Sequence, residues 1–335
     1  MILKDEKKLD LSYIPDKIMC RDEEIRRLRY LIKSGRALIS GGVGTGKTLL
    51  ARYVGGDAYV NCYVNRTEHR VLEEILKQIK PKFNPAGLPT QKLWNEIDGK
   101  RIIIDEIDGM EIDELRHFAY TLSRQKEFGK KIDYIAITRS HLILKQILDE
   151  ATWSTFAQNS VVELKPYSWE QMKEILSYRA SESLNRECYD EEIISLIADI
   201  AISSVGHTRT GISILLNSSL IAETKMHKKI EVEDVREANI DEIFFDLNTM
   251  EKEELLLLLS VADACKNKAY VSYDEIMEKF FLRNEEYEMN IDERKFEKIF
   301  KKLLSQDLIK ESKFGYTILN FPANLLVKEI EKIIS

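Results

Sequence analysis

The segment GGVGTGKT, residues 41–48, combines the glycines, lysine and threonine that a phosphate-binding loop requires. It fits the pattern G-x-x-x-x-G-K-[ST] in full, between a short apolar run and an amphipathic segment. Its glycines allow successive N–H groups to face phosphate oxygens, and the helix that follows adds the positive end of its dipole. The segment therefore predicts a site for ATP or ADP, formed by Gly41, Gly42, Val43, Gly44, Thr45, Gly46, Lys47, Thr48 and Leu49.

Two acids downstream complete the chemistry that such a loop needs. The segment RIIIDEID, residues 101–108, reads as a central strand with acids at its carboxyl end, where ligands bind in open α/β sheets. Lys47 is expected to reach the β- and γ-phosphates, and Thr48 and Asp105 to hold Mg²⁺. Glu106 is then the candidate catalytic residue, because a carboxylate there can polarise the attacking water. Without the upstream loop, the same acids would read as a solvated turn.

The elements that position these residues alternate between strands and helices. Strands are expected at residues 37–40, 58–64, 102–104, 131–139 and 161–164, and helices at 22–32, 49–54, 70–79, 91–97 and 111–125. Such alternation predicts a parallel α/β sheet. Residues 81–90 carry three prolines and a glycine, which indicates a loop.

Composition excludes several classes of protein. The 335 residues are 44% hydrophobic, enough for more than one core, and the net charge of −7 restricts any nucleic-acid contact to a local patch. Four scattered cysteines indicate neither zinc nor a disulfide framework. No leader-like or membrane-spanning apolar run is present, so we expect a soluble, cytoplasmic, nucleoid-associated protein with no membrane partner.

In the second half of the chain, the alternation of strands and helices ends. From residue 168 to about 238 the pattern is only helical, with Ser168 as an expected N-cap. Helices at 252–264, 274–281 and 292–305, a short strand at 269–272 and a terminal hairpin at 308–319 then make a winged-helix pattern. We therefore divide the chain into an ATPase base at 1–166, a helical lid at 167–245 and a winged-helix DNA-binding domain at 246–335.

The helix at 292–305 carries the candidate DNA contacts. Its apolar residues recur at helical spacing and fix the buried face, so the outward face is basic. The alternative is an ordinary solvated lysine face, since acidic residues outnumber basic ones after residue 246. The predicted DNA-binding residues are Arg294, Lys295, Lys298, Lys301 and Lys302, with Lys313 at the hairpin tip.

Taken in order, these features resemble the archaeal origin-recognition and cell-division-control initiators, a family of AAA+ ATPases. The resemblance rests on YIPD at 13–16 with Arg21 and Glu24, YVNC at 59–62, DEID at 105–108, KPY at 165–167, IL at 175–176, RA at 179–180, Gly206 with Arg209, and the winged helix. It implies an α/β P-loop AAA+ domain with a parallel sheet, a helical lid and a C-terminal winged-helix domain. It also implies that Tyr167 and Arg179 lie beside the nucleotide and that Arg209 is the phosphate sensor of the lid. A buried packing role is the alternative for Tyr167.

Three positions depart from the family's pattern. Arg139 stands at the sensor position after the strand at 131–139, where the family usually has asparagine, and Ala151 replaces the arginine that reaches a neighbouring subunit. His207 replaces the usual acid after Gly206. The first two predict a slow ATPase. The loop at 81–94 corresponds to the family's DNA-touching insertion, and Lys80, Lys82 and Lys92 are its basic residues.

The favoured function is therefore an ATP-binding, weakly hydrolysing replication initiator, a divergent paralogue that recognises double-stranded origin DNA and works with other initiator subunits or a helicase. Two alternatives stay open at this point. One is a signalling or transposition-helper AAA+ ATPase whose winged helix packs internally. The other is a nucleotide-locked DNA-binding protein with negligible turnover.

Overall fold

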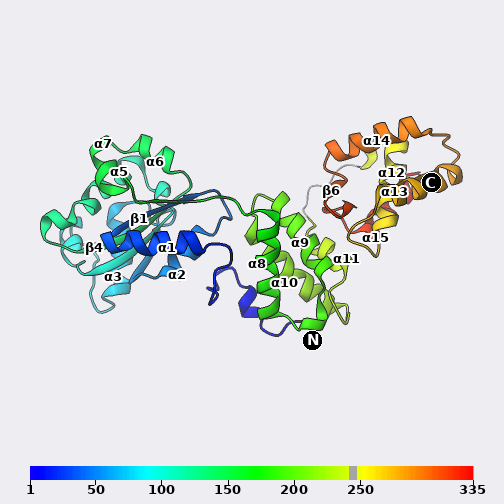
Figure 1. The fold of residues 1–335 in the computed structure, drawn as a ribbon. Helices are drawn as coiled ribbons and strands as arrows, with labels where there is room; N and C mark the ends of the chain where they lie inside the picture. The colour runs from blue at the N-terminus through cyan, green and yellow to red at the C-terminus, as the bar shows by residue number, and fades with distance from the viewer. Residues whose placement is uncertain (241–246, 335) are drawn as a thin grey trace. The chain divides into compact units, whose positions relative to one another are not determined.

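The computed structural model describes residues 1–240 and 247–334 (Figure 1). The chain divides into two compact units. One unit is residues 14–167, and the other combines residues 1–13 with 168–335. The first residues join the second unit because they pack on it: Leu3 forms an antiparallel bridge with Leu184, and Glu223 accepts hydrogen bonds from the N–H groups of Ile2 and Leu3. The division into base, lid and winged helix at the predicted boundaries stays a prediction.

The first unit contains a five-stranded sheet in the order β2-β3-β4-β1-β5, and all its paired strands are parallel. The strands are β1 (Arg36–Gly41), β2 (Ala58–Asn61), β3 (Lys100–Asp105), β4 (Ile132–Thr138) and β5 (Val161–Leu164). Their apolar runs are buried, as expected of parallel strands covered on both faces. Because all strands run the same way, their carboxyl ends lie at one edge of the sheet.

Neighbouring residues of β1 point into two different cores, which is why helices cover both faces. Leu38 lies in a cluster with α3 (Glu68–Ile79), α4 (Thr90–Asn95), α5 (Ile112–Ser123), α6 (His141–Ile147) and α7 (Glu150–Phe156). Ile39 lies in the other cluster, with α1 (Asp22–Leu31) and α2 (Lys47–Val54). Strand β2 ends at Asn61, earlier than predicted, and α6 and α7 were not predicted. Both are short and begin at side-chain caps, Ser140 and Asp149.

Within the second unit, four helices form the lid: α8 (Trp169–Ser183), α9 (Glu191–Ser203), α10 (Thr208–Thr224) and α11 (Val232–Ala238). Ser168 caps α8 in a capping box with Gln171, as its position predicted. The connector predicted near residues 240–250 lies partly outside the described residues. In the part of the chain that the structure describes, no helix is long and apolar enough to cross a membrane.

The remainder of this unit has the winged-helix order α12 (Lys252–Cys265), α13 (Tyr273–Glu286), α14 (Glu293–Ser305), β6 (Lys310–Ser312), β7 (Gly315–Thr317) and α15 (Ala323–Ile334). The strand predicted at 269–272 is only a single bridge, Val271 to Tyr316. The hairpin predicted at 308–319 is confirmed as β6 and β7, but it is not terminal, because α15 follows it and buries Leu326 and Ile330 in the same core as α12.

Candidate nucleotide site

The phosphate loop joins the carboxyl end of β1 to the first turn of α2, as the sequence predicted. Gly44 and Gly46 have φ of +73° and +88°, a conformation that glycine adopts without strain. The Lys47 ammonium donates to the carbonyl oxygens of Gly41 and Gly42, at 2.7 and 2.6 Å. These carbonyls hold the cation against the loop, and phosphate oxygens would take their place when Lys47 reaches a nucleotide.

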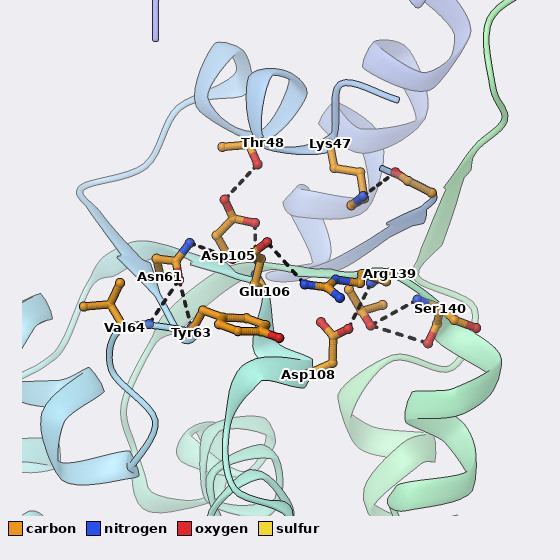
Figure 2. Close-up of polar contacts among 12 residues, drawn as sticks. Lys47, Thr48, Asn61, Tyr63, Val64, Asp105, Glu106, Asp108, Arg139 and Ser140 are labelled. Carbon is orange, nitrogen blue, oxygen red and sulfur yellow. Dashed lines mark hydrogen bonds and ion pairs between the residues drawn. The ribbon is translucent and has the colours of Figure 1, made fainter. Parts of the chain in front are cut away.

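Asp105 lies beside Thr48 at the carboxyl end of β3 (Figure 2). Its carboxylate is buried and accepts hydrogen bonds from the Thr48 hydroxyl and the Tyr59 hydroxyl, both at 2.8 Å. Burial, together with the hydrogen bond to Asp105, raises the pKa of Tyr59 to about 12, so this phenol remains a donor. One carboxylate next to one hydroxyl fits Mg²⁺, which takes few protein ligands and completes its shell with water and phosphate oxygens.

Glu106 lies one residue further, and its backbone is left-handed, with φ of +51°. Such a conformation is uncommon outside glycine and is found at functional sites. The side-chain amide of Asn61 donates to one Glu106 carboxylate oxygen at 3.0 Å, and the Arg139 guanidinium lies 4.0 Å from the other (Figure 2). The candidate catalytic carboxylate therefore accepts one hydrogen bond from a neutral amide and faces a guanidinium at ion-pair distance.

Arg139 itself has a supporting residue. Its guanidinium lies over the ring of Tyr63, 5.3 Å from the ring centre, which is within the range of a cation–π contact. The backbone of Tyr63 is held in turn, because its N–H donates to the Asn61 side-chain oxygen at 2.8 Å. Arg139, although exposed, therefore lies on the side of Glu106.

Tyr167 lies in the same unit as the phosphate loop. A Cβ built on Gly46 would stand 3.3 Å from the Tyr167 hydroxyl, so the phenol reaches the loop. The Arg21 guanidinium lies 4.0 Å from the centre of the Tyr167 ring and donates to the carbonyl oxygens of Thr45 and Lys165. Burial raises the pKa of Tyr167. Arg21 therefore ties the loop to the end of β5.

Arg179 and Arg209 belong to the other unit, so their predicted approach to the nucleotide stays a prediction. Arg179 is buried and donates to the carbonyl oxygens of Lys8 and Tyr13, which fixes the N-terminal segment. Burial lowers its pKa. Arg209 is exposed in the first turn of α10. Next to it, the buried hydroxyl of Thr208 has no hydrogen-bond partner among the described residues.

The predicted DNA-binding residues divide into two groups. Arg294, Lys298 and Lys301 are exposed on α14, opposite the buried Phe296 and Phe300. Lys295 and Lys302 form ion pairs with Glu253 and Glu254 of α12, so these two cations help to hold the helix on its domain. Lys313, at the hairpin tip, contacts the lid.

The predicted insertion at 81–94 contains the loop between α3 and α4 and most of α4. Lys80 forms an ion pair with Glu96 at 2.7 Å, and Lys82 and Lys92 are exposed. Trp94 is buried and donates its indole N–H to Glu68 at 2.7 Å, which anchors the end of the segment.

Sequence reasoning missed the roles of Tyr59, Asn61 and Tyr63 at this site. Their signal was present, because Tyr59 lies within β2, Asn61 ends it and Tyr63 follows it. Strand β2 pairs with β3 so that Asn61 stands opposite Asp105. What the sequence could not give is this register, which decides that the polar end of β2 faces the acids.

Comparison with known proteins identifies proteins that are similar to this chain. The sequence model of the Cdc6 AAA+ ATPase-type lid domain matches residues 173–240. The ORC1-type DNA replication protein 1 of Methanosarcina acetivorans is 29% identical over 295 residues, which cover 78% of this chain and 70% of that protein. The resemblance to archaeal Cdc6 and ORC1-type proteins is confirmed.

Solved structures show the same fold. The crystal structure of Cdc6p from Pyrobaculum aerophilum has a TM-score of 0.87 at 22% identity, over 100% of this chain and 99% of that one. The Aeropyrum pernix ORC1 protein in complex with DNA has a TM-score of 0.63 at 23% identity, over 98% and 96%. The fold of this Cdc6/ORC1-like chain is therefore that of an AAA+ protein with a helical lid and a C-terminal winged helix.

Proposed function

We propose that this Cdc6/ORC1-like chain is an ATP-binding initiator of DNA replication that recognises duplex origin DNA and hydrolyses ATP slowly. One observation carries the proposal most directly: Lys47 and Thr48 of the phosphate loop lie with Asp105 and Glu106 at one edge of the sheet, in a chain related to ORC1-type replication proteins. Fold alone would not support it, because AAA+ folds serve many functions.

Nucleotide and Mg²⁺ are assigned to residues by their chemistry. The loop N–H groups and Lys47 would hold the phosphates, and Thr48 with Asp105 would hold Mg²⁺, which supplies charge neutralisation at the β- and γ-oxygens. Tyr167, Arg179 and Arg209 complete the proposed site, with Arg209 contacting phosphate from the lid. ADP would fill the same loop.

Slow turnover follows from the surroundings of Glu106. A general base must face the attacking water, yet one oxygen of Glu106 accepts a hydrogen bond from Asn61 and the other lies 4.0 Å from the Arg139 guanidinium. Ala151 cannot supply a cation to a neighbouring subunit. The Arg139 contact also favours the second candidate function, a nucleotide-locked DNA-binding protein with negligible turnover. Another initiator subunit or a helicase is the proposed protein partner. Such a partner would supply the arginine that Ala151 replaces in this chain.

DNA recognition is assigned to α14. Its exposed basic residues are arranged like those of a recognition helix, and the related Aeropyrum pernix ORC1 protein has been solved in complex with DNA. The matching fold alone would also suit a signalling or transposition-helper ATPase. Sequence-specific binding to origin DNA would favour the initiator over these alternatives.

The deciding experiment measures binding of purified protein to origin-derived duplexes and to shuffled duplexes of equal length, with ATP, with ADP and without nucleotide. We expect sequence-specific protection that depends on nucleotide, and loss of nucleotide binding in Lys47→Ala. Equal affinity for both duplexes in every state would contradict origin recognition. ATP turnover measured on the same samples, with and without DNA, distinguishes a slow ATPase from a nucleotide-locked protein.

A further inference from the structure

The tip of the β6–β7 hairpin, residues 312–314, is held by the lid. Asp199, on α9, accepts three hydrogen bonds: from the indole N–H of Trp169 at 2.7 Å, from the Tyr270 hydroxyl at 2.6 Å and from the Ser312 hydroxyl at 2.9 Å. One carboxylate thus joins the start of α8, the segment before α13 and the hairpin. We call residues 312–314 the wing tip, and Trp169, Glu170 and Asp199 the lid clamp.

Lys313 and Phe314 add a cation and a ring to this contact. The Lys313 ammonium lies 3.4 Å from the centre of the Trp169 ring and 3.3 Å from a carboxylate oxygen of Glu170. The Phe314 ring packs between two aromatic rings, with its centre 5.7 Å from that of Trp169 and 5.2 Å from that of Tyr270. Lys313 and Phe314 therefore both contact Trp169 of the lid.

The backbone of the hairpin fixes this orientation. Val271 and Tyr316 exchange backbone hydrogen bonds at 2.9 and 2.8 Å beside the turn. Gly315 has φ of +128°, and a Cβ there would stand 2.5 Å from the Val271 carbonyl oxygen. Only glycine fits this close approach, so the turn delivers Lys313 and Phe314 to the lid clamp in a defined direction.

We propose that the lid clamp is an autoinhibitory contact that competes with duplex DNA for the wing tip. The two contacts exclude each other, because a single ammonium cannot lie on the Trp169 ring beside Glu170 and also approach a DNA phosphate. While the clamp holds, DNA contacts only α14, and release of the tip adds Lys313 to the interface. This inference rests on the proposed DNA binding, although the clamp itself can be tested without DNA.

The variant Asp199→Asn opens the clamp from the lid side and leaves the wing tip unchanged. An amide offers one oxygen and turns its NH₂ toward the remaining donors, so it cannot accept all three hydrogen bonds. Glu187→Gln is the matched control, because Glu187 is exposed in the same unit and outside the clamp. Trp169→Ala is the second lid-side variant, since it removes the ring under Lys313.

The first measurement is amide hydrogen exchange of the intact protein. We expect exchange at residues 311–316 to increase at least several-fold in Asp199→Asn and Trp169→Ala, while exchange in α9 and α12 of these variants stays at the parent level. In the control Glu187→Gln, exchange should match the parent at every one of these segments. Unchanged exchange at residues 311–316 in both clamp variants would overturn the clamp. Increased exchange throughout α9 would identify unfolding, in which case the other variant decides.

The second measurement is a double-mutant cycle of duplex DNA affinity with Lys313→Ala. We expect Lys313→Ala to change affinity less than about 2-fold in the parent. Asp199→Asn should tighten binding by several-fold and steepen the slope of log affinity against log salt by about 0.9, the value for one phosphate contact. Lys313→Ala in the Asp199→Asn protein should remove that gain.

Each outcome of the cycle decides one question. If Asp199→Asn tightens DNA binding equally in the absence of Lys313, the proposed competition is wrong. It is also wrong if hydrogen exchange shows an open clamp and DNA affinity stays at the parent value. Absence of DNA binding in the parent and in every variant contradicts the proposed function instead, and hydrogen exchange still shows whether the clamp exists.

Discussion

Asp105 and Glu106 are adjacent carboxylates with different environments. Asp105 is buried and accepts two hydroxyl donors, which suits a group that holds a cation in place. Glu106 is partly exposed, in a left-handed conformation, and faces Asn61 and Arg139. The two environments support the proposed roles of Asp105 in metal binding and of Glu106 in water activation.

At Lys47, truncation separates nucleotide binding from folding. Lys47→Ala should abolish ATP binding, because it removes the cation that faces the β- and γ-phosphates. Binding is measured with labelled ATP, and thermal unfolding of the variant serves as the control for the fold. ATP binding equal to that of the parent would show that the loop does not hold phosphate as proposed.

Glu106→Gln should retain ATP binding and lose hydrolysis. The amide keeps the size of the side chain but lacks the charge that polarises water, and such a base contributes roughly 10²- to 10⁴-fold. Single-turnover hydrolysis with radiolabelled ATP measures the effect on a slow enzyme. Turnover at the parent rate would remove Glu106 from the catalytic role.

Arg139→Asn should raise the rate of hydrolysis while the affinity for ATP changes little. Asparagine at this position cannot form the ion pair with Glu106, so the carboxylate gains access to water. Arg139→Lys retains a cation and is the matched control, with turnover near that of the parent. A slower Arg139→Asn variant would show that Arg139 promotes the reaction.

At the scale of elements, α14 combines a buried apolar face with three exposed cations. Its flanking lysines, Lys295 and Lys302, pair with acids of α12. Arg294, Lys298 and Lys301 are exposed on the outward face, where Lys301 lies 4.0 Å from Glu297. The geometry of one helix therefore separates cations that stabilise the domain from cations available to a phosphate backbone.

The triple variant Arg294→Ala, Lys298→Ala, Lys301→Ala should weaken duplex binding and leave folding and ATP binding intact. If all three residues contact phosphates, the slope of log affinity against log salt should decrease by up to about three, near 0.9 per contact. The double variant Lys328→Ala, Lys332→Ala on α15 is the charge control. Parent affinity and slope in the triple variant would assign DNA contact to the region around Lys80, Lys82 and Lys92 instead.

At the scale of the whole molecule, Arg236 joins the lid to the winged helix within one unit. It is fully buried on α11, forms an ion pair with Glu233 at 2.7 Å and donates to the carbonyl oxygens of Ile318, Cys265 and Lys268. Arg236 of α11 thereby provides the hydrogen-bond donor for the carbonyl oxygens at the end of α12 and just after β7. This contact and the lid clamp connect the same two parts of the chain.

Arg236→Met should lower the free energy of unfolding by ~3–5 kcal/mol, because it leaves Glu233 and several buried carbonyl oxygens unpaired. Chemical denaturation followed by circular dichroism measures the loss, and hydrogen exchange in α11 and α12 locates it. Arg294→Met, at an exposed position, is the control. A change below ~1 kcal/mol would show that water replaces the guanidinium.

The intact protein alone should hydrolyse ATP well below ~1 s⁻¹, the low end of the usual enzyme range. Both the engaged Glu106 and the absence of a trans arginine at Ala151 motivate this value. Steady-state turnover of the protein alone, with DNA, and with a second initiator provides the check. Rapid turnover of the protein alone would contradict an incomplete hydrolytic site, and rapid turnover only with the second initiator would show that it supplies the arginine.

The sequence by itself determined the local features of this protein. The strand–loop–helix around Lys47, the acids after three isoleucines and the apolar stripe of α14 are encoded by spacing within a few residues, so each was predicted near its observed bounds. Ser168 likewise caps α8 through contacts three residues away. The sequence analysis missed the short helices α6 and α7, whose stability depends on what they pack against. It also missed α15, although Leu326, Val327, Ile330 and Ile334 recur there at helical spacing.

Only the tertiary structure decided which distant residues meet. Strand register brings Asn61 and Tyr59 to the acids, and Arg139, which the sequence showed only as a departure from a pattern, is placed against Glu106. The sequence offered Lys313 as a cation for DNA, whereas packing sets it on Trp169. Such pairings join residues tens to more than a hundred positions apart, and the physical cause is burial of shared apolar surface, which no local spacing records.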